Sequence, residues 1–241
     1  MADLEIALRI HVNVALTTID LLPAVHDVGS ALCEAFSAGH RVYTFGNGGS
    51  AAEAQHLVAE LIGRYRGTRR ALPAQSLASD PSVVTCIGND FDFDQVFARQ
   101  ISALVDPGDV AIAFTTSGRS PNVVNGLAVA RRRGAVTVLF GAGDGADAAA
   151  HADLSLLVAS DDTARAQEMH LLLLHLVSAV VDDWAEQGES DTSMDDEPGG
   201  RIYPAIEGPD PSPRSTRGPP AVPSPPRDRR RAASRPDAMK G

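Results

Sequence analysis

Short apolar runs alternate with helix-patterned segments over most of this chain. The segments 41–45, 110–114 and 135–140 are dominated by apolar and β-branched residues and lack the strict apolar–polar alternation of a strand with one face in water. Strands of this kind, separated by helices, are typical of a parallel sheet covered on both faces. The sequence therefore predicts an α/β fold, a doubly wound parallel sheet flanked by helices.

The element boundaries follow from turn residues and helix caps. Gly39 is suited to end one helix and Pro121 to begin another. Strands are expected at 41–45, 74–78, 110–114, 135–140 and 153–158. Helices are expected at 3–20, 24–38, 50–63, 93–104, 121–133, 145–151 and 163–187, with further helical residues from position 82. The first helix carries more apolar residues than a surface helix needs, among them Val12 and Leu16, which predicts contacts with a partner chain.

The composition changes after Trp184. Eleven of the sixteen prolines lie between Pro198 and the end, and large apolar residues almost vanish there. Such a segment buries too little apolar surface to offset the entropy lost on ordering. We therefore expect a folded domain at 1–187 and a disordered Pro- and Arg-rich tail at 188–241.

Charge and cysteine content narrow the expected partners. The formal net charge of −10 lies mainly on the predicted domain and disfavours nucleic acid as its partner. The two cysteines, Cys33 and Cys86, lie in apolar surroundings and do not indicate a disulfide framework, which fits a reducing cytoplasm. The N-terminus is acidic, and no apolar run reaches membrane-spanning length. We therefore expect neither export nor a membrane partner.

A glycine-rich turn, Gly46-Asn47-Gly48-Gly49-Ser50, connects the first expected strand to a helix. Glycines permit close backbone approach, and a helix N-terminus offers unpaired N–H groups with a partial positive charge. The turn is either a tight connection or a cradle for a phosphate or a sugar hydroxyl. It lacks both the G-x-G-x-x-G spacing and the P-loop lysine, so no nucleotide cofactor is expected. His56 and Glu60, four residues apart, share one face of the following helix.

A second polar loop, Thr115-Thr116-Ser117-Gly118-Arg119-Ser120, follows the expected strand 110–114. Ser and Thr cap helices routinely, but four hydroxyl residues within six positions exceed what one cap needs. The cluster therefore predicts a phosphate site at a helix N-terminus. In an open α/β sheet, ligands bind where loops leave the carboxyl ends of neighbouring strands. We expect both loops to face one pocket.

Five motifs of the chain together are specific: Gly46–Ser50, His56–Tyr65, Gly88–Phe91, Thr116–Ser120 and Ala164–His170. On these motifs the chain resembles the sugar isomerase (SIS) domain family and, within it, the bacterial phosphoheptose isomerases. The resemblance covers residues 1 to about 187. It implies a cytoplasmic homotetramer that converts sedoheptulose 7-phosphate to D-glycero-D-manno-heptose 7-phosphate, a ketose–aldose isomerisation through an enediol in heptose biosynthesis.

The resemblance also implies roles for individual residues. Glu60 and His175 would be the base and the acid. Residues expected to contact the substrate are Asn47, Gly48, Gly49, Ser50, Glu60, Asn89, Asp90, Thr115, Thr116, Ser117, Ser120 and Gln167. The family is associated with Zn²⁺, and the ligands would be His56, Glu60, Gln167 and His175, an acceptable set of nitrogen and oxygen donors.

The spacing on the last helix is compatible with these roles. Gln167 and His175 are eight residues apart, about 80° around a helix, so both can face one cleft. His170 is offset from His175 by about 140° and is expected to point elsewhere. Two positions depart from the family pattern at the rim of the phosphate site: Thr115 stands where Ser is usual, and Arg119 where a small residue or Asn is usual.

Two other functions remain open. One is a non-catalytic SIS-domain protein that associates with the bacterial replication initiator; in that relative the position matching His175 is Asn, whereas this chain has His. The other is a regulator that senses sugar phosphates, which would normally carry a DNA-binding domain. No helix-turn-helix precedes the expected sheet, so the sequence favours the isomerase.

Overall fold

The computed structural model describes residues 3–192 and the side chains of residues 3–187. Its helices are α1 (Leu4–Thr17), α2 (Leu22–Ser37), α3 (Gly49–Ile62), α4 (Pro81–Asp90), α5 (Val96–Leu104), α6 (Pro121–Arg132), α7 (Ala146–Ala149) and α8 (Thr163–Thr192), with 3-10 turns η1 (Thr18–Leu21) and η2 (Phe93–Gln95). Its strands are β1 (Val42–Gly46), β2 (Ala74–Ser76), β3 (Val110–Phe114), β4 (Val136–Ala142) and β5 (Leu154–Val158). The predicted tail at 188–241 lies almost wholly outside the described residues.

The five strands form one parallel sheet in the order β2-β1-β3-β4-β5. The strand order reverses between β1 and β3, and the loops that leave these two strands are the two polar loops singled out in the sequence. In doubly wound sheets this switch point is where ligands bind. The predicted fold class is confirmed.

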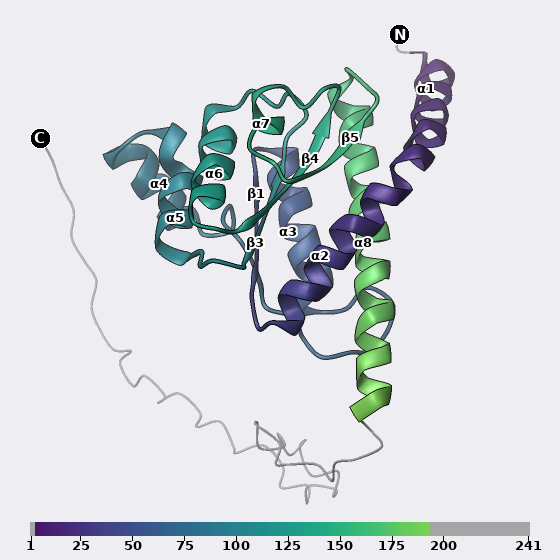
Figure 1. Cartoon of the computed structure of the whole chain (residues 1–241). Helices are drawn as coiled ribbons and strands as arrows, with labels where there is room; N and C mark the ends of the chain where they lie inside the picture. The colour runs from purple at the N-terminus through teal and green to yellow at the C-terminus, as the bar shows by residue number, and fades with distance from the viewer. Residues whose placement is uncertain (1–2, 193–241) are drawn as a thin grey trace, which may run out of the picture. The chain divides into compact units, whose positions relative to one another are not determined.

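Helices cover both faces of the sheet (Figure 1). On one face, α2, α3 and α8 pack over a core that contains Leu57, Ile112 and Phe114. On the other face, α5 and α6 pack over a core that contains Phe45 and Leu139. Because successive strand residues point to opposite faces, strands covered on both sides must be apolar at nearly every position. That requirement explains the continuous apolar runs in the sequence.

The N-terminal helices differ from the expectation of two separate helices. The 3-10 turn η1 joins α1 to α2, so the helical segment Leu4–Ser37 is continuous. By length and composition this segment is long and apolar enough to cross a membrane, contrary to the sequence expectation, which treated it as two shorter pieces. Its second half packs into the core through residues such as Val28 and Leu32, whereas α1 extends beyond the sheet (Figure 1).

Candidate active site

The glycine turn brings the start of α3 against α8. Gly48 precedes the helix with a φ of +57°, a conformation that L side chains rarely adopt. A Cβ placed on Gly49 would collide with the side-chain amide of Gln167 on α8. Gly48 therefore permits the backbone of the turn, and Gly49 lets the polar side chain of Gln167 lie directly against it.

The loop between β3 and α6 is built as a cup of hydroxyls and N–H groups. Thr115 Oγ1 accepts a hydrogen bond from the N–H of Gly118 at 3.1 Å, which curls the loop. Ser120 occupies the N-cap of α6, but its side chain makes no capping hydrogen bond. Its hydroxyl is thus available to an anion at the N-terminus of α6. Pro121 has no N–H group, and the N–H of Val123 already donates to Asn122 Oδ1 at 3.0 Å.

A residue pair that the sequence analysis missed ties the two loops together. The side-chain amides of Asn47 and Asn122 exchange two hydrogen bonds, at 2.9 and 2.8 Å. In the sequence, the one sign of this role was the position of Asn122, directly after Pro121 at the start of α6, next to the expected ligand-binding edge of the sheet. The pair fixes the glycine turn relative to the hydroxyl loop.

Two cavities meet at Gln167. The first, about 190 Å³, is lined by polar side chains of both loops and by Thr163, another residue the sequence analysis missed. Its lining residues are Asn47, Ser50, Phe114, Thr115, Thr116, Ser117, Ser120, Thr163 and Gln167. The second, about 320 Å³, is lined by Ala52, Glu53, His56, Gln167, Glu168 and Leu171. A ligand that fills the first cavity therefore contacts Gln167, which also borders the cavity lined by His56. Glu60 and His175 line neither cavity.

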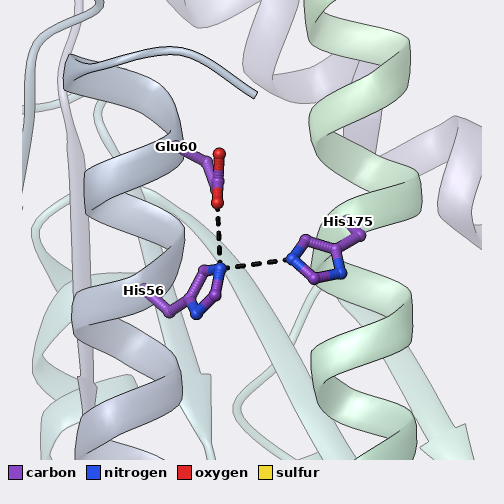
Figure 2. A group of neighbouring side chains, drawn as sticks. All are labelled: His56, Glu60 and His175. Carbon is purple, nitrogen blue, oxygen red and sulfur yellow. Dashed lines mark hydrogen bonds and ion pairs between the residues drawn. The ribbon is translucent and has the colours of Figure 1, made fainter. Parts of the chain in front are cut away.

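His56, Glu60 and His175 form a compact cluster between α3 and α8 (Figure 2). His56 Nε2 lies 2.9 Å from Glu60 Oε1 and 3.2 Å from His175 Nε2. Burial, followed by repulsion from His56, lowers the pKa of His175 below its usual value. The cluster thus combines a carboxylate with a histidine that is neutral at pH 7.

The donor atoms of this cluster fit a zinc ion. Tetrahedral zinc ligands at about 2.0–2.1 Å from the metal lie about 3.3 Å from one another. The spacings of 2.9 and 3.2 Å around His56 Nε2 are close to that value, and all three donor atoms lie within 4.8 Å of one another. Gln167 shares the second cavity with His56, which places the fourth predicted ligand nearby.

The segment after α3 packs over the cluster and was also missed by the sequence analysis. The ring of Tyr65 stacks on His175 at 5.3 Å between centroids. Arg69 donates hydrogen bonds to the main-chain oxygens of Glu60 and Leu61 at the end of α3. These contacts fix both the backbone that carries Glu60 and one face of the His175 ring.

Comparisons with known proteins show the family to which the chain belongs. A family model described as the SIS domain matches residues 15–142. A phosphoheptose isomerase from Pelobacter propionicus is 47% identical over 163 residues, which cover 68% of this chain and 86% of the relative. One from Geobacter sp. is 42% identical over 184 residues, covering 76% and 95%. This chain belongs to the SIS domain family, among the phosphoheptose isomerases.

Solved structures of the family share its fold. The phosphoheptose isomerase GmhA from Neisseria gonorrhoeae has a TM-score of 0.71 and 32% identity, over 75% of this chain and 97% of that one. A phosphoheptose isomerase from Francisella tularensis has a TM-score of 0.73 and 29% identity, over 76% and 100%. The likeness therefore spans nearly the full length of those chains.

Two predicted substrate residues of this SIS-domain chain lie apart from the others. Asn89 and Asp90 end α4, are exposed, and bond to each other through Asn89 Nδ2 and Asp90 Oδ1 at 2.7 Å. Like Glu60 and His175, they line neither of the two cavities, and unlike Glu60 and His175 they are not part of the cluster at His56. Helix α4 and helix α8 lie on opposite sides of the molecule (Figure 1). Within one chain these residues do not join the cluster around Glu60.

Proposed function

We propose that this chain is a phosphoheptose isomerase that interconverts sedoheptulose 7-phosphate and D-glycero-D-manno-heptose 7-phosphate. The observation that carries the proposal is the junction at Gln167, where a hydroxyl-lined cavity meets a second cavity lined by His56, one member of the carboxylate–imidazole cluster. One part suits a phosphate and the other suits proton transfer. A phosphorylated ketose needs both, at opposite ends of the molecule.

In this proposal the hydroxyl loop binds the phosphate. The hydroxyls of Ser117, Ser120 and the Thr115–Thr116 pair supply neutral donors, and the N-terminus of α6 adds a partial positive charge. Binding the phosphate at this fixed point positions the distant carbonyl end of the sugar. Binding energy of the non-reacting end is thereby used to orient the reacting carbons.

Glu60 and His175 then move the protons. Isomerisation transfers one proton between C1 and C2 and another between O1 and O2, through an enediol. Glu60 serves as the base at carbon, and His175 moves the proton between the oxygens. The lowered pKa of His175 supports this role because a neutral imidazole has one nitrogen that donates and one that accepts. Asn in place of His175 would lack this capacity, so the presence of His favours the enzyme over the non-catalytic relative.

The residues present fit a zinc ion held by His56, Glu60 and His175, with Gln167 as a fourth ligand. When bound, Zn²⁺ would supply a Lewis acid for the substrate carbonyl, and Glu60 and His175 would have to be released from the ion when substrate binds in order to act as base and acid. The nitrogen and oxygen donors and their spacing support this assignment.

We also propose a homotetramer in the cytoplasm. Helix α1 exposes a run of large apolar side chains that includes Leu4, Ile6, Leu8, Ile10, Val12 and Leu16. A second copy of the chain is the proposed cover, and in that assembly Asn89 and Asp90 are proposed to line the site of a neighbouring chain. Both cysteines are free thiols, which supports a reducing compartment.

One assay tests the function directly. Purified protein is incubated with sedoheptulose 7-phosphate, and the aldoheptose phosphate is measured. Sedoheptulose without the phosphate is the matched control. We expect turnover of the first and very poor turnover of the second. Absence of product from the phosphorylated sugar, with folded protein, would contradict the proposal.

A further inference from the structure

A second pair of ionisable side chains lies between the same two helices. Glu53 on α3 and His170 on α8 are both buried, and Glu53 Oε2 lies 3.4 Å from His170 Nδ1. Neither atom has a hydrogen-bond partner among the described residues, and both are closed off from solvent. The mechanism proposed above uses neither residue. A buried carboxylate and a buried imidazole that face one another therefore require an explanation.

The other ring nitrogen of His170 fixes where its hydrogen lies. His170 Nε2 is 3.0 Å from the main-chain oxygen of Gly141 on β4. A carbonyl oxygen only accepts hydrogen bonds, so Nε2 must carry a hydrogen. In neutral His170, Nδ1 would then present a lone pair to Glu53. An ionised Glu53 facing that lone pair would place two buried acceptors together with no hydrogen between them.

One hydrogen between the two atoms removes this conflict. Either a protonated imidazole donates from Nδ1 to the carboxylate, or a neutral carboxylic acid donates to Nδ1. In both cases the pair holds the same proton and carries no net charge. The ring is fully buried and lies edge-on to the rings of Phe114 and Phe140, whose centroids are 6.1 and 6.2 Å away, and these contacts hold Nδ1 toward Glu53.

We propose that Glu53 and His170 share one proton and that this pair is the strut that sets the spacing of α3 and α8 at the active site. Glu53 precedes His56 by three residues on α3, and His170 lies between Gln167 and His175 on α8. The hydrogen bond of His170 to Gly141 anchors the strut to the sheet. The pair consists of positioning residues, and the inference rests on the proposed function only for its kinetic test.

The spacing matters because the cluster is divided between the two helices. His56 and Glu60 come from α3, and His175 comes from α8, with 3.2 Å between the two Nε2 atoms. The phosphate loop, in contrast, belongs to β3 and α6. The phosphate cavity takes only part of its lining from these two helices, Ser50 from α3 and Thr163 and Gln167 from α8. Loss of the strut should therefore misplace the proton-transfer groups more than the hydroxyls of the phosphate loop. Misplacement of reacting groups by about 1 Å can lower turnover about 10²-fold.

Two substitutions of similar size isolate the shared hydrogen. Glu53→Gln supplies an amide N–H that can donate to the lone pair of neutral His170, so the strut is kept. Glu53→Met fills the same volume but supplies no hydrogen. We expect Glu53→Met to lower kcat for sedoheptulose 7-phosphate by about tenfold to 10²-fold, with KM changed less than about twofold. Glu53→Gln should stay within about threefold of wild type in kcat.

Hydrogen–deuterium exchange gives a readout that does not depend on catalysis. Peptides covering 165–178 should exchange faster in Glu53→Met than in wild type, and Glu53→Gln should match wild type. Ile101→Val, a core change on the opposite face of the sheet, controls for a general loss of stability and should not loosen 165–178. If the wild-type protein has no isomerase activity, the proposed function is wrong, but the exchange measurement still tests the strut. Equal exchange and equal kcat in the Gln and Met variants would contradict the proposal that the Glu53–His170 pair sets the spacing of α3 and α8.

Discussion

Arg69 and Asp182 form a buried ion pair, with Arg69 Nε 2.6 Å from Asp182 Oδ1. The same carboxylate accepts hydrogen bonds from the main-chain N–H groups of Arg66 and Gly67. Because Arg69 also bonds to the main-chain oxygen of Glu60, the pair connects the end of α3 to α8 through one guanidinium. This connection holds the segment that places Tyr65 on His175.

The pair makes stability depend on pH. Burial alone would raise the pKa of Asp182, but the N–H groups of Arg66 and Gly67 and the Arg69 side chain together hold it below its usual value of 3.8. A carboxyl whose pKa is lowered by folding stabilises the protein above its unfolded pKa, and this stabilisation is lost as pH falls through the folded pKa. We therefore expect the stabilisation by Asp182 to be complete at neutral pH and to be lost progressively below about pH 4.

Asp182→Asn tests this dependence. At pH 7 the variant should unfold with about 3–5 kcal/mol less free energy than wild type, because Arg69 keeps a buried charge without its partner. The difference should shrink as pH falls from 5 to 2, where wild-type Asp182 becomes protonated. Urea unfolding of both proteins at a series of pH values measures this difference in the free energy of unfolding. A difference that stays constant across this range would contradict the assignment.

The same pair illustrates what sequence alone can predict. The apolar strands, the two polar loops and the pairing of His56 with Glu60 depend on neighbouring residues, so periodicity and spacing predicted them. Arg69 and Asp182 are 113 positions apart, and only the packing of α3 against α8 brings them together. The sequence analysis left a break between the helices 3–20 and 24–38, whereas the chain continues there as the 3-10 turn η1. No residue pattern distinguishes such a turn from an irregular connection. His170 does point away from the cluster, as its angular offset predicted, but its contact with Glu53 required the folded chain.

The phosphate loop gives a prediction about substrate affinity. Ser117→Ala combined with Ser120→Ala should lower kcat/KM for sedoheptulose 7-phosphate roughly 10²-fold or more, because each hydrogen bond to a charged group contributes about 1.5–3 kcal/mol. Ser102→Ala on α5, whose hydroxyl bonds only to its own helix, is the matched control and should leave kcat/KM unchanged. An unchanged kcat/KM in the double variant would show that the phosphate binds elsewhere.

The zinc assignment is tested by metal binding. Isothermal titration of metal-free protein with Zn²⁺ should detect a site that His56→Ala weakens at least tenfold, because one of its few ligands is removed. His26→Ala, an exposed histidine on α2, should bind Zn²⁺ as wild type does. Chelation should lower isomerase activity, and added Zn²⁺ should restore it. Full activity in protein shown to be zinc-free by elemental analysis would remove the metal from the mechanism.

Mixed oligomers test whether Asn89 and Asp90 act on a neighbouring chain. Copies with Glu60→Gln are mixed in equal amounts with copies carrying Asn89→Ala and Asp90→Ala. If each site takes Glu60 from one chain and the α4 pair from another, about one site in four combines two intact halves after random assembly. The mixture should therefore regain about a quarter of wild-type activity although each parent is nearly inactive. A mixture no more active than its parents would place both halves in one chain.

Glu60 and His175 carry the last prediction. Glu60→Gln removes the carboxylate base with little change in shape, and it should lower kcat at least about 10²-fold, the lower end of general-base contributions. His175→Gln should act similarly, because the amide cannot exchange a proton between the two substrate oxygens. KM should change little in both variants, since the phosphate is bound at Thr115–Ser120 and not by these side chains. Tyr65→Phe keeps the ring stacked on His175, so its kcat should stay close to that of wild type. Tyr65→Ala removes the stacked ring and should have a lower kcat. Near-wild-type turnover in either Glu60→Gln or His175→Gln would refute the acid–base assignment.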